Sequence, residues 1–148
     1  MKFNEAAKII KDMEKSAKAI SEMVDVMGVM AINHYKKSFI NGGFTDETLQ
    51  LWKHRKREDR GRYAKNAGSR AVLVKTGKLK RSLVAKKFGR YAVRITSNVN
   101  YANVHNEGLR AGRGKGFTMP KRQFVGYSGM LSAKIELRLR NKIQRIFK

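Results

Sequence analysis

The feature that most constrains the fold is a long stretch of helical periodicity at the start of the chain. Neither proline nor a turn cluster interrupts residues 3–35, and apolar or small side chains recur there in steps of three and four. This spacing places one stripe along one side of an α-helix. Its members are Phe3, Ala6, Ile10, Met13, Ala17, Ile20, Val24, Met27 and Ala31. We therefore predict a helix over residues 3–40 that ends at the breaker Asn41-Gly42-Gly43.

The length of this helix bears on assembly. About thirty helical residues span about 45 Å at 1.5 Å per residue, which is longer than the rest of so small a domain can cover. We expect part of the helix to pack against another subunit. After Met23 the apolar residues cover a wider face of the helix, so the second half is predicted to be buried on more than one side. The spacing would also suit a coiled coil, but the many alanines and Gly28 favour packing on a sheet.

The rest of the chain predicts an α+β fold in a single domain over residues 1–148. Residues 41–70 are predicted to be a long basic loop, of a kind that is usually functional or ordered by a partner. Residues 71–106 are predicted to form a sheet region, in which 82–88 and 91–98 alternate as the two strands of a hairpin. Thr76 is positioned to cap a short helical turn before them.

The C-terminal part is predicted from glycine content and periodicity. Residues 107–127 form a glycine-rich basic loop and a lead-in segment. Residues 128–147 have the apolar spacing of an amphipathic helix, with lysines and arginines around it. The expected fold thus has a long N-terminal helix, a small antiparallel sheet and a C-terminal amphipathic helix.

Composition restricts the partners. The chain has 34 Lys and Arg against 11 Asp and Glu, a net charge of +23, which attracts anionic partners. Nucleic acid is the first candidate, ahead of an acidic protein or a membrane face. The opening residues lack the apolar core of a secretory signal, and no stretch approaches the roughly 20 apolar residues of a membrane span. We expect a cytoplasmic origin and no membrane partner.

Catalytic chemistry has little material in this sequence. The chain has no cysteine, and His34, His54 and His105 are far apart, which argues against a metal site. His105 and Glu107 are two residues apart, and side chains at that spacing do not face each other on a helix. The stretch GLRAGRGKG lacks the spacing of a phosphate-binding loop. We predict that the protein is not an enzyme and has no catalytic residue, cofactor or metal.

Basic residues form the candidate anion or partner site. The run from Trp52 to Arg70 mixes aromatic and cationic side chains, which is how single strands are held by stacking and phosphate neutralisation. No helix-turn-helix, zinc finger or ribonucleoprotein motif accompanies it, so a phosphate contact here would be non-specific. The candidate residues are Lys53, Arg55, Lys56, Arg57, Arg60, Arg62, Arg110, Arg113 and Lys115.

Three blocks in order carry a family pattern. They are LVKTGKLKRSL at 73–83, YANVHNEG at 101–108 and MPKRQFVG at 119–126, with Trp52 upstream. As an ordered set they resemble the tailed-phage virion morphogenesis family, which includes tail completion proteins. The resemblance implies a virion protein made in the host bacterial cytoplasm. It also implies a ring, a hexamer by resemblance, at the head-proximal end of the tail or at the neck, bound to tail-tube or connector proteins.

The resemblance assigns structural roles to single residues. Thr76 and Gly77 would form a tight capped turn, Leu79 would fill the core, and Pro120, Arg122 and a buried Phe124 would fix the lead into the last helix. Tyr101, Ala102 and His105 would lie where the chain packs closely on the sheet. The full set is Trp52, Thr76, Gly77, Leu79, Ser82, Tyr101, Ala102, His105, Gly108, Pro120, Arg122 and Phe124.

Two functional hypotheses remain after these steps. The first is a phage assembly protein of the tail or neck that forms a ring. The alternative is a basic protein that binds nucleic acid without sequence preference. The two are compatible, because a ring around a passing genome could have a cationic lumen with DNA as a further anion.

Overall fold

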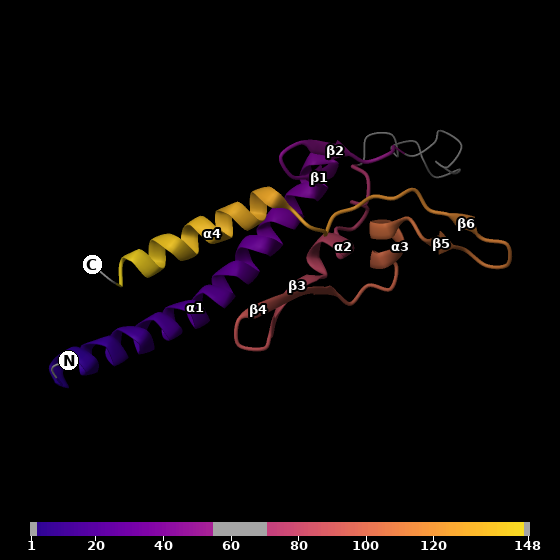
Figure 1. The fold of residues 1–148 in the computed structure, drawn as a ribbon. Coiled ribbons are helices and arrows are strands. Elements are labelled where there is room, and N and C mark those ends of the chain that lie inside the picture. Colours follow the sequence, from indigo (N-terminus) through magenta and orange to yellow (C-terminus); the bar gives the residue numbers. More distant parts are fainter. Residues whose placement is uncertain (1–2, 55–70, 147–148) are drawn as a thin grey trace.

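A computed structural model describes residues 3–54 and 71–146 of the chain and confirms the α+β fold (Figure 1). Two long helices and three short antiparallel hairpins account for most of the described structure. In chain order the elements are α1 (Phe3–Asn41), β1 (Gly43–Thr45), β2 (Leu49–Leu51), α2 (Lys78–Arg81), β3 (Leu83–Phe88), β4 (Ala92–Ser97), α3 (Ala102–Glu107), β5 (Arg110–Ala111), β6 (Phe117–Thr118) and α4 (Gly129–Gln144).

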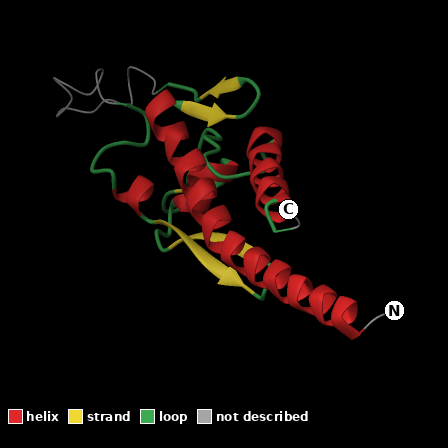
Figure 2. Ribbon diagram, turned by 90° about the vertical axis from the view of Figure 1, so that its left-hand side faces the viewer, coloured by secondary structure: helices red, strands yellow, loops and turns green. Residues whose placement is uncertain are grey.

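Helix α1 organises the molecule. Its 39 residues span about 58 Å and agree with the predicted helix over residues 3–40. The second half lies between the β3–β4 hairpin and α4 (Figure 2). Val24 and Phe39 are 1% and 2% exposed there, so this half is buried on more than one side, as predicted. A Cβ at Gly28 would lie 3.0 Å from the Cβ of Ala85, so the glycine lets α1 approach β3 closely.

The strands form three separate two-stranded sheets and not one. The predicted hairpin in residues 82–98 is present as β3 and β4, with Leu83 opposite Ser97 and Phe88 opposite Ala92. The expectation of a loop throughout residues 41–70 was wrong for 43–51, where β1 and β2 pair, and residues 55–70 lie outside the described part. Strands of three residues are too short to show a period of two, which is why the pattern missed them.

Two further segments differ from the prediction. The glycine-rich segment contains the β5–β6 hairpin, whose turn uses glycines with positive φ, such as Gly112 at 96° and Gly114 at 59°. The expected sheet region 71–106 includes most of a helix, α3. The sequence pattern missed this helix because six residues are too few to display a helical period. Gly108 ends that helix with φ 72°, and a Cβ there would lie 2.9 Å from the backbone nitrogen of Lys121.

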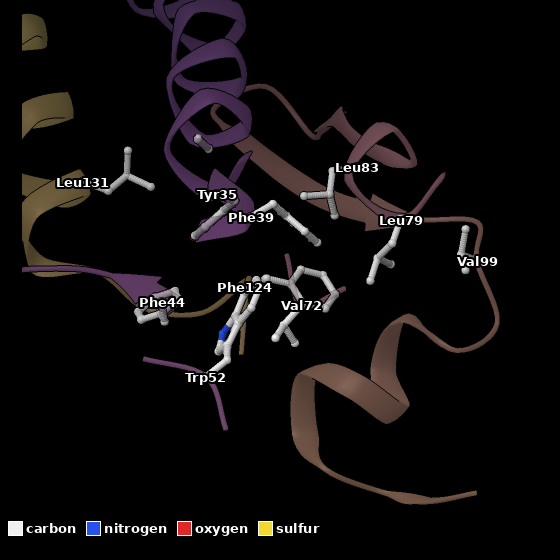
Figure 3. Close-up of a cluster of buried hydrophobic side chains, with 11 residues drawn as sticks. Tyr35, Phe39, Phe44, Trp52, Val72, Leu79, Leu83, Val99, Phe124 and Leu131 are labelled. Atoms are coloured by element: carbon white, nitrogen blue, oxygen red, sulfur yellow. The ribbon is translucent and has the colours of Figure 1, made fainter. Parts of the chain in front are cut away.

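The main core lies at the C-terminal end of α1 (Figure 3). The Phe39 ring packs against those of Trp52 and Phe124, with centroid distances of 5.5 and 5.2 Å. Leu79 and Leu83 close it from α2 and β3. Aromatic groups from three distant segments thus meet on one turn of α1, and their burial is the main stabilising contribution here.

Helix α4 is fixed to the β1–β2 hairpin at its start and to α1 near its end. Ser128, the N-cap residue, accepts a hydrogen bond from the Leu131 amide at 3.1 Å and donates one to Asp46 Oδ1 at 2.6 Å. The Ser128 hydroxyl, followed by the Met130 amide, lowers the pKa of Asp46. Lys142 Nζ donates to Glu22 Oε2 at 2.6 Å. No helix in the described ranges is long and apolar enough to cross a membrane.

Candidate functional site: a cationic cleft where three motifs meet

The three motif blocks, far apart in the sequence, line one cleft of about 880 Å³. The first block contributes α2 and the turn before it, and the second contributes α3. The third block contributes the segment that follows β6. Two residues that follow β2 complete the wall, Lys53 and His54. Seven of the predicted motif residues are among the lining side chains: Leu79, Thr76, Gly77, Tyr101, His105, Pro120 and Arg122.

Block one forms a tight turn at the rim. The N-cap residue of α2 is Gly77, one position later than the expected Thr76. Gly77 has a φ of 71°, which a glycine adopts readily. Thr76 Oγ1 still accepts a hydrogen bond from the Lys78 amide at 3.3 Å. The Thr76 carbonyl accepts one from Arg81 Nη2 at 2.8 Å. Leu79 is 3% exposed and belongs to the core, where the resemblance places it.

Blocks two and three are held together by hydrogen bonds. The Oδ1 atom of Asn106 accepts hydrogen bonds from the amides of Phe124 and Val125 at 2.9 and 3.0 Å. The His105 carbonyl accepts one from the Arg122 amide at 2.8 Å. These bonds fix the lead into α4 along α3, so Phe124 is carried into the core at 2% exposure.

Trp52 connects the end of β2 to the third block. Its indole Nε1 donates to the Gln123 carbonyl at 2.6 Å, and its ring is buried against Phe39. The Arg122 side chain, 6% exposed, donates from Nε to the Lys53 carbonyl at 3.0 Å. The two walls of the cleft are therefore tied to each other, so the site is positioned by packed elements.

The charge of the cleft has one sign. Lys53, Lys75, Lys78 and Arg122 line it, and none of the described lining residues is Asp or Glu. A concave site with cations and no anion concentrates a positive potential. The arrangement suits binding of carboxylate or phosphate groups on a partner.

His105 adds a polar atom without a partner. Within the described structure its buried Nδ1 makes no hydrogen bond, and its ring packs edge-on to Tyr101 with a centroid distance of 5.8 Å. Burial, followed by the nearby charge of Arg122, lowers the pKa of His105. The neutral ring is therefore favoured. Tyr101 is the N-cap residue of α3, at the start of that helix.

The remaining predicted residues that the structure describes are not part of the cleft lining. Ser82 joins α2 to β4, since its hydroxyl lies 2.7 Å from that of Ser97. Ala102 and Gly108 begin and end α3. Arg110, Arg113 and Lys115 are exposed on the β5–β6 hairpin. The other anion-binding candidates lie outside the described residues: Arg55, Lys56, Arg57, Arg60 and Arg62.

Sequence reasoning missed several residues that build the site. Asn106 is part of the second motif block, but nothing in the sequence indicates that its side chain holds the third block. Leu73, which lines the cleft, has φ 62°, a conformation that is rare for a branched residue and concentrates at functional sites. Lys75 and Lys78 lie within the first block, where the charge alone could have marked them.

The described ranges hold no group of three or more His, Cys, Asp or Glu side chains that could bind a metal ion.

We compared the chain with family models, curated proteins and solved structures. The curated proteins and the solved structures gave no match. The model of the phage virion morphogenesis family matches residues 2–144, nearly the whole chain. The match includes every block that lines the cleft. The chain belongs to the phage virion morphogenesis family, so it is a virion-associated protein with a role in phage assembly.

Proposed function

We propose that the protein acts in tail completion or head–tail joining, as a ring of identical subunits that binds tail-tube or connector proteins. The observation that carries the proposal is the start of α1, residues 5–18, which the described part of the chain leaves without a buried side chain. The apolar side chains there include Ile9, Ile10 and Met13, which are 50%, 58% and 66% exposed. Contiguous exposed apolar surface on a folded chain marks a protein–protein interaction site. Family membership supports the assembly role, and the stripe supports self-association within it.

The cationic cleft supplies the second part of the proposal, a docking site for an acidic surface. Its cations come from three segments that the core holds in place, so the site is preorganised. Electrostatic complementarity of this kind speeds association and selects the partner. We infer that the protein works by binding at this site, without catalysis and without a cofactor, at the tail or neck of the virion.

Sizing and imaging test the ring. Light scattering and negative-stain imaging of the full chain, alone and with tail-tube protein, should give a closed oligomer, and a hexamer is the size that the resemblance implies. A strict monomer at high concentration that forms no ring with tail-tube or connector protein would contradict the proposal.

Charge reversal tests the cleft. The double substitution Lys53→Glu/Lys78→Glu should weaken binding to the partner at least tenfold, because it places carboxylates in a site that has only cations among its described lining residues. Lys86→Glu/Arg90→Glu, at exposed positions of β3 and of the turn after it, is the matched control with the same change of net charge. Equal binding by both variants would show that the cleft is not the docking site.

A second candidate function is non-specific nucleic-acid binding. The observation that favours it is the β5–β6 hairpin, where exposed Arg110, Arg113 and Lys115 lie beside Phe117, which is 59% exposed. Cations with an aromatic ring hold single strands by phosphate contact and stacking. Affinity should fall steeply with salt, and Arg113→Ser/Lys115→Ser should reduce that slope by about 1 to 2. Absence of binding near physiological salt would exclude this function.

A further inference from the structure

The first part of α1 and the groove between α1 and α4 have complementary surfaces. We define the arm as residues 3–18 of α1. From residue 5 to residue 18 no described side chain is buried, whereas Ala19 is 5% exposed and begins the covered part of the helix. The arm extends beyond both α4 and the β3–β4 hairpin (Figure 1). It therefore has an apolar stripe that the described part of its own chain leaves open.

The groove has an apolar floor. It measures about 810 Å³, and its floor includes Met23, Val26 and Met30 of α1 and Leu137 of α4, the last being 59% exposed. At 1.5 Å per residue the 16 residues of α4 span about 24 Å, and the arm spans about the same length. The groove's lining runs from Lys134 to Ile146, or about 18 Å, so about three turns of a helix such as the arm would lie along it.

The two surfaces also match in charge. Lys134, Arg138, Lys142 and Arg145 border the groove. On the arm, the helical period places Glu5 and Asp12 along one edge of the apolar stripe and Glu14 along the other. The arm's lysines, including Lys11 and Lys18, fall on the side away from the stripe.

We propose that the arm of one copy of this chain docks in the α1–α4 groove of the next copy. Apolar side chains would fill the floor, and the acidic edges of the stripe would face the basic borders. Arm and groove are different patches, so the contact is heterologous and propagates from copy to copy until it closes in a ring. This inference rests on the proposed ring and names the surface that builds it.

Cysteine cross-linking tests the contact directly. The natural chain has no cysteine, so Met13→Cys with Leu137→Cys introduces the sole pair of thiols, both at exposed positions. The groove's part of α1, Met23 to Met30, lies 10 to 17 residues beyond Met13, or roughly 15 to 25 Å along the helix. A disulfide needs Cα atoms within about 7 Å, so a bond within one chain is out of reach.

The expected result is a ladder of covalent oligomers under mild oxidation. Lys11→Cys with Leu137→Cys is the matched control, because position 11 lies on the back of the arm. The stripe pair should cross-link at least fivefold more than this control. As a second measurement, Ile10→Ser/Met13→Ser should shift the oligomer to monomer by light scattering, whereas Lys11→Ser/Lys18→Ser, with the same helix propensity cost, should assemble as the natural chain does.

The outcomes separate the two proposals. If the natural chain forms rings but the stripe pair cross-links no better than its control and Ile10→Ser/Met13→Ser still assembles, the arm contact is overturned and the ring survives. If the natural chain stays monomeric with and without tail-tube protein, the ring itself is refuted and the arm contact with it. Preferential cross-linking together with loss of assembly supports the arm contact.

Discussion

The two halves of α1 carry the same apolar spacing in different surroundings. Phe39 in the second half is 2% exposed and touches the rings of two other segments, whereas Met13 in the first half is 66% exposed. A helical period fixes which side chains share a face, but the cover for that face comes from elsewhere in the chain or from another chain. The second half is thus a core element, and we infer that the first half is an assembly element.

The largest effect is expected where the covered half meets the core. Phe39→Ala removes a ring that packs on Trp52 and Phe124, so it should lower the free energy of unfolding by about 3–5 kcal/mol. Urea unfolding, followed by far-UV circular dichroism at concentrations where the protein is monomeric, measures the loss. A loss below about 1 kcal/mol would mean that the second half of α1 is not the core element.

A smaller effect is expected at the clamp between motif blocks. Asn106→Ala leaves the Phe124 and Val125 amides without their acceptor and should cost about 1–3 kcal/mol of stability. It should also weaken binding of the tail partner, since the third block lines the cleft. Asn100→Ala, at an exposed position near the start of α3, is the control. Equal stability of the two variants would show that the clamp does not hold the site.

The hydrogen bond between Asp46 of the β1–β2 hairpin and Ser128 of α4 should make the stability of the fold depend on pH. The Ser128 hydroxyl lowers the folded-state pKa of Asp46, so the ionised carboxylate stabilises the fold above the unfolded-state value. That contribution is lost as pH falls through the folded-state pKa. The melting temperature of the natural chain should therefore exceed that of Asp46→Asn at pH 7, and the gap should shrink below about pH 4. A gap that stays constant down to pH 2 would contradict this account.

The smallest effect is expected in the arm. Ile10→Ala should change the free energy of unfolding of the monomer by less than about 0.5 kcal/mol, because the 58% exposed side chain has little burial to lose. Urea unfolding under the conditions used for Phe39→Ala gives the comparison. If this substitution destabilised the monomer by as much as a core truncation, the arm would be covered by its own chain, and the contrast between the two halves of α1 would fail.

Long periodic elements were predictable and short ones were not. The bounds of α1 and of the β3–β4 hairpin lie within one residue of the predicted ranges, because many residues repeat the same pattern there. The β1–β2 and β5–β6 hairpins and α3 were missed, since two to six residues cannot show a period. Their formation depends on contacts with distant segments, such as the hydrogen bond from the Ser128 hydroxyl to Asp46, which lies between β1 and β2.

The site was predictable as a set of residues but not as a place. The sequence contains the three blocks, the excess of positive charge and the stripe on α1, and those features alone determined the family expectation, the helical frame and the prediction of an anionic partner. Only the tertiary structure decided that Thr76, His105 and Arg122 line one cleft and that the described residues leave the start of α1 uncovered. Periodicity and charge are properties of neighbouring residues, whereas convergence and cover depend on how segments far apart in the chain pack together.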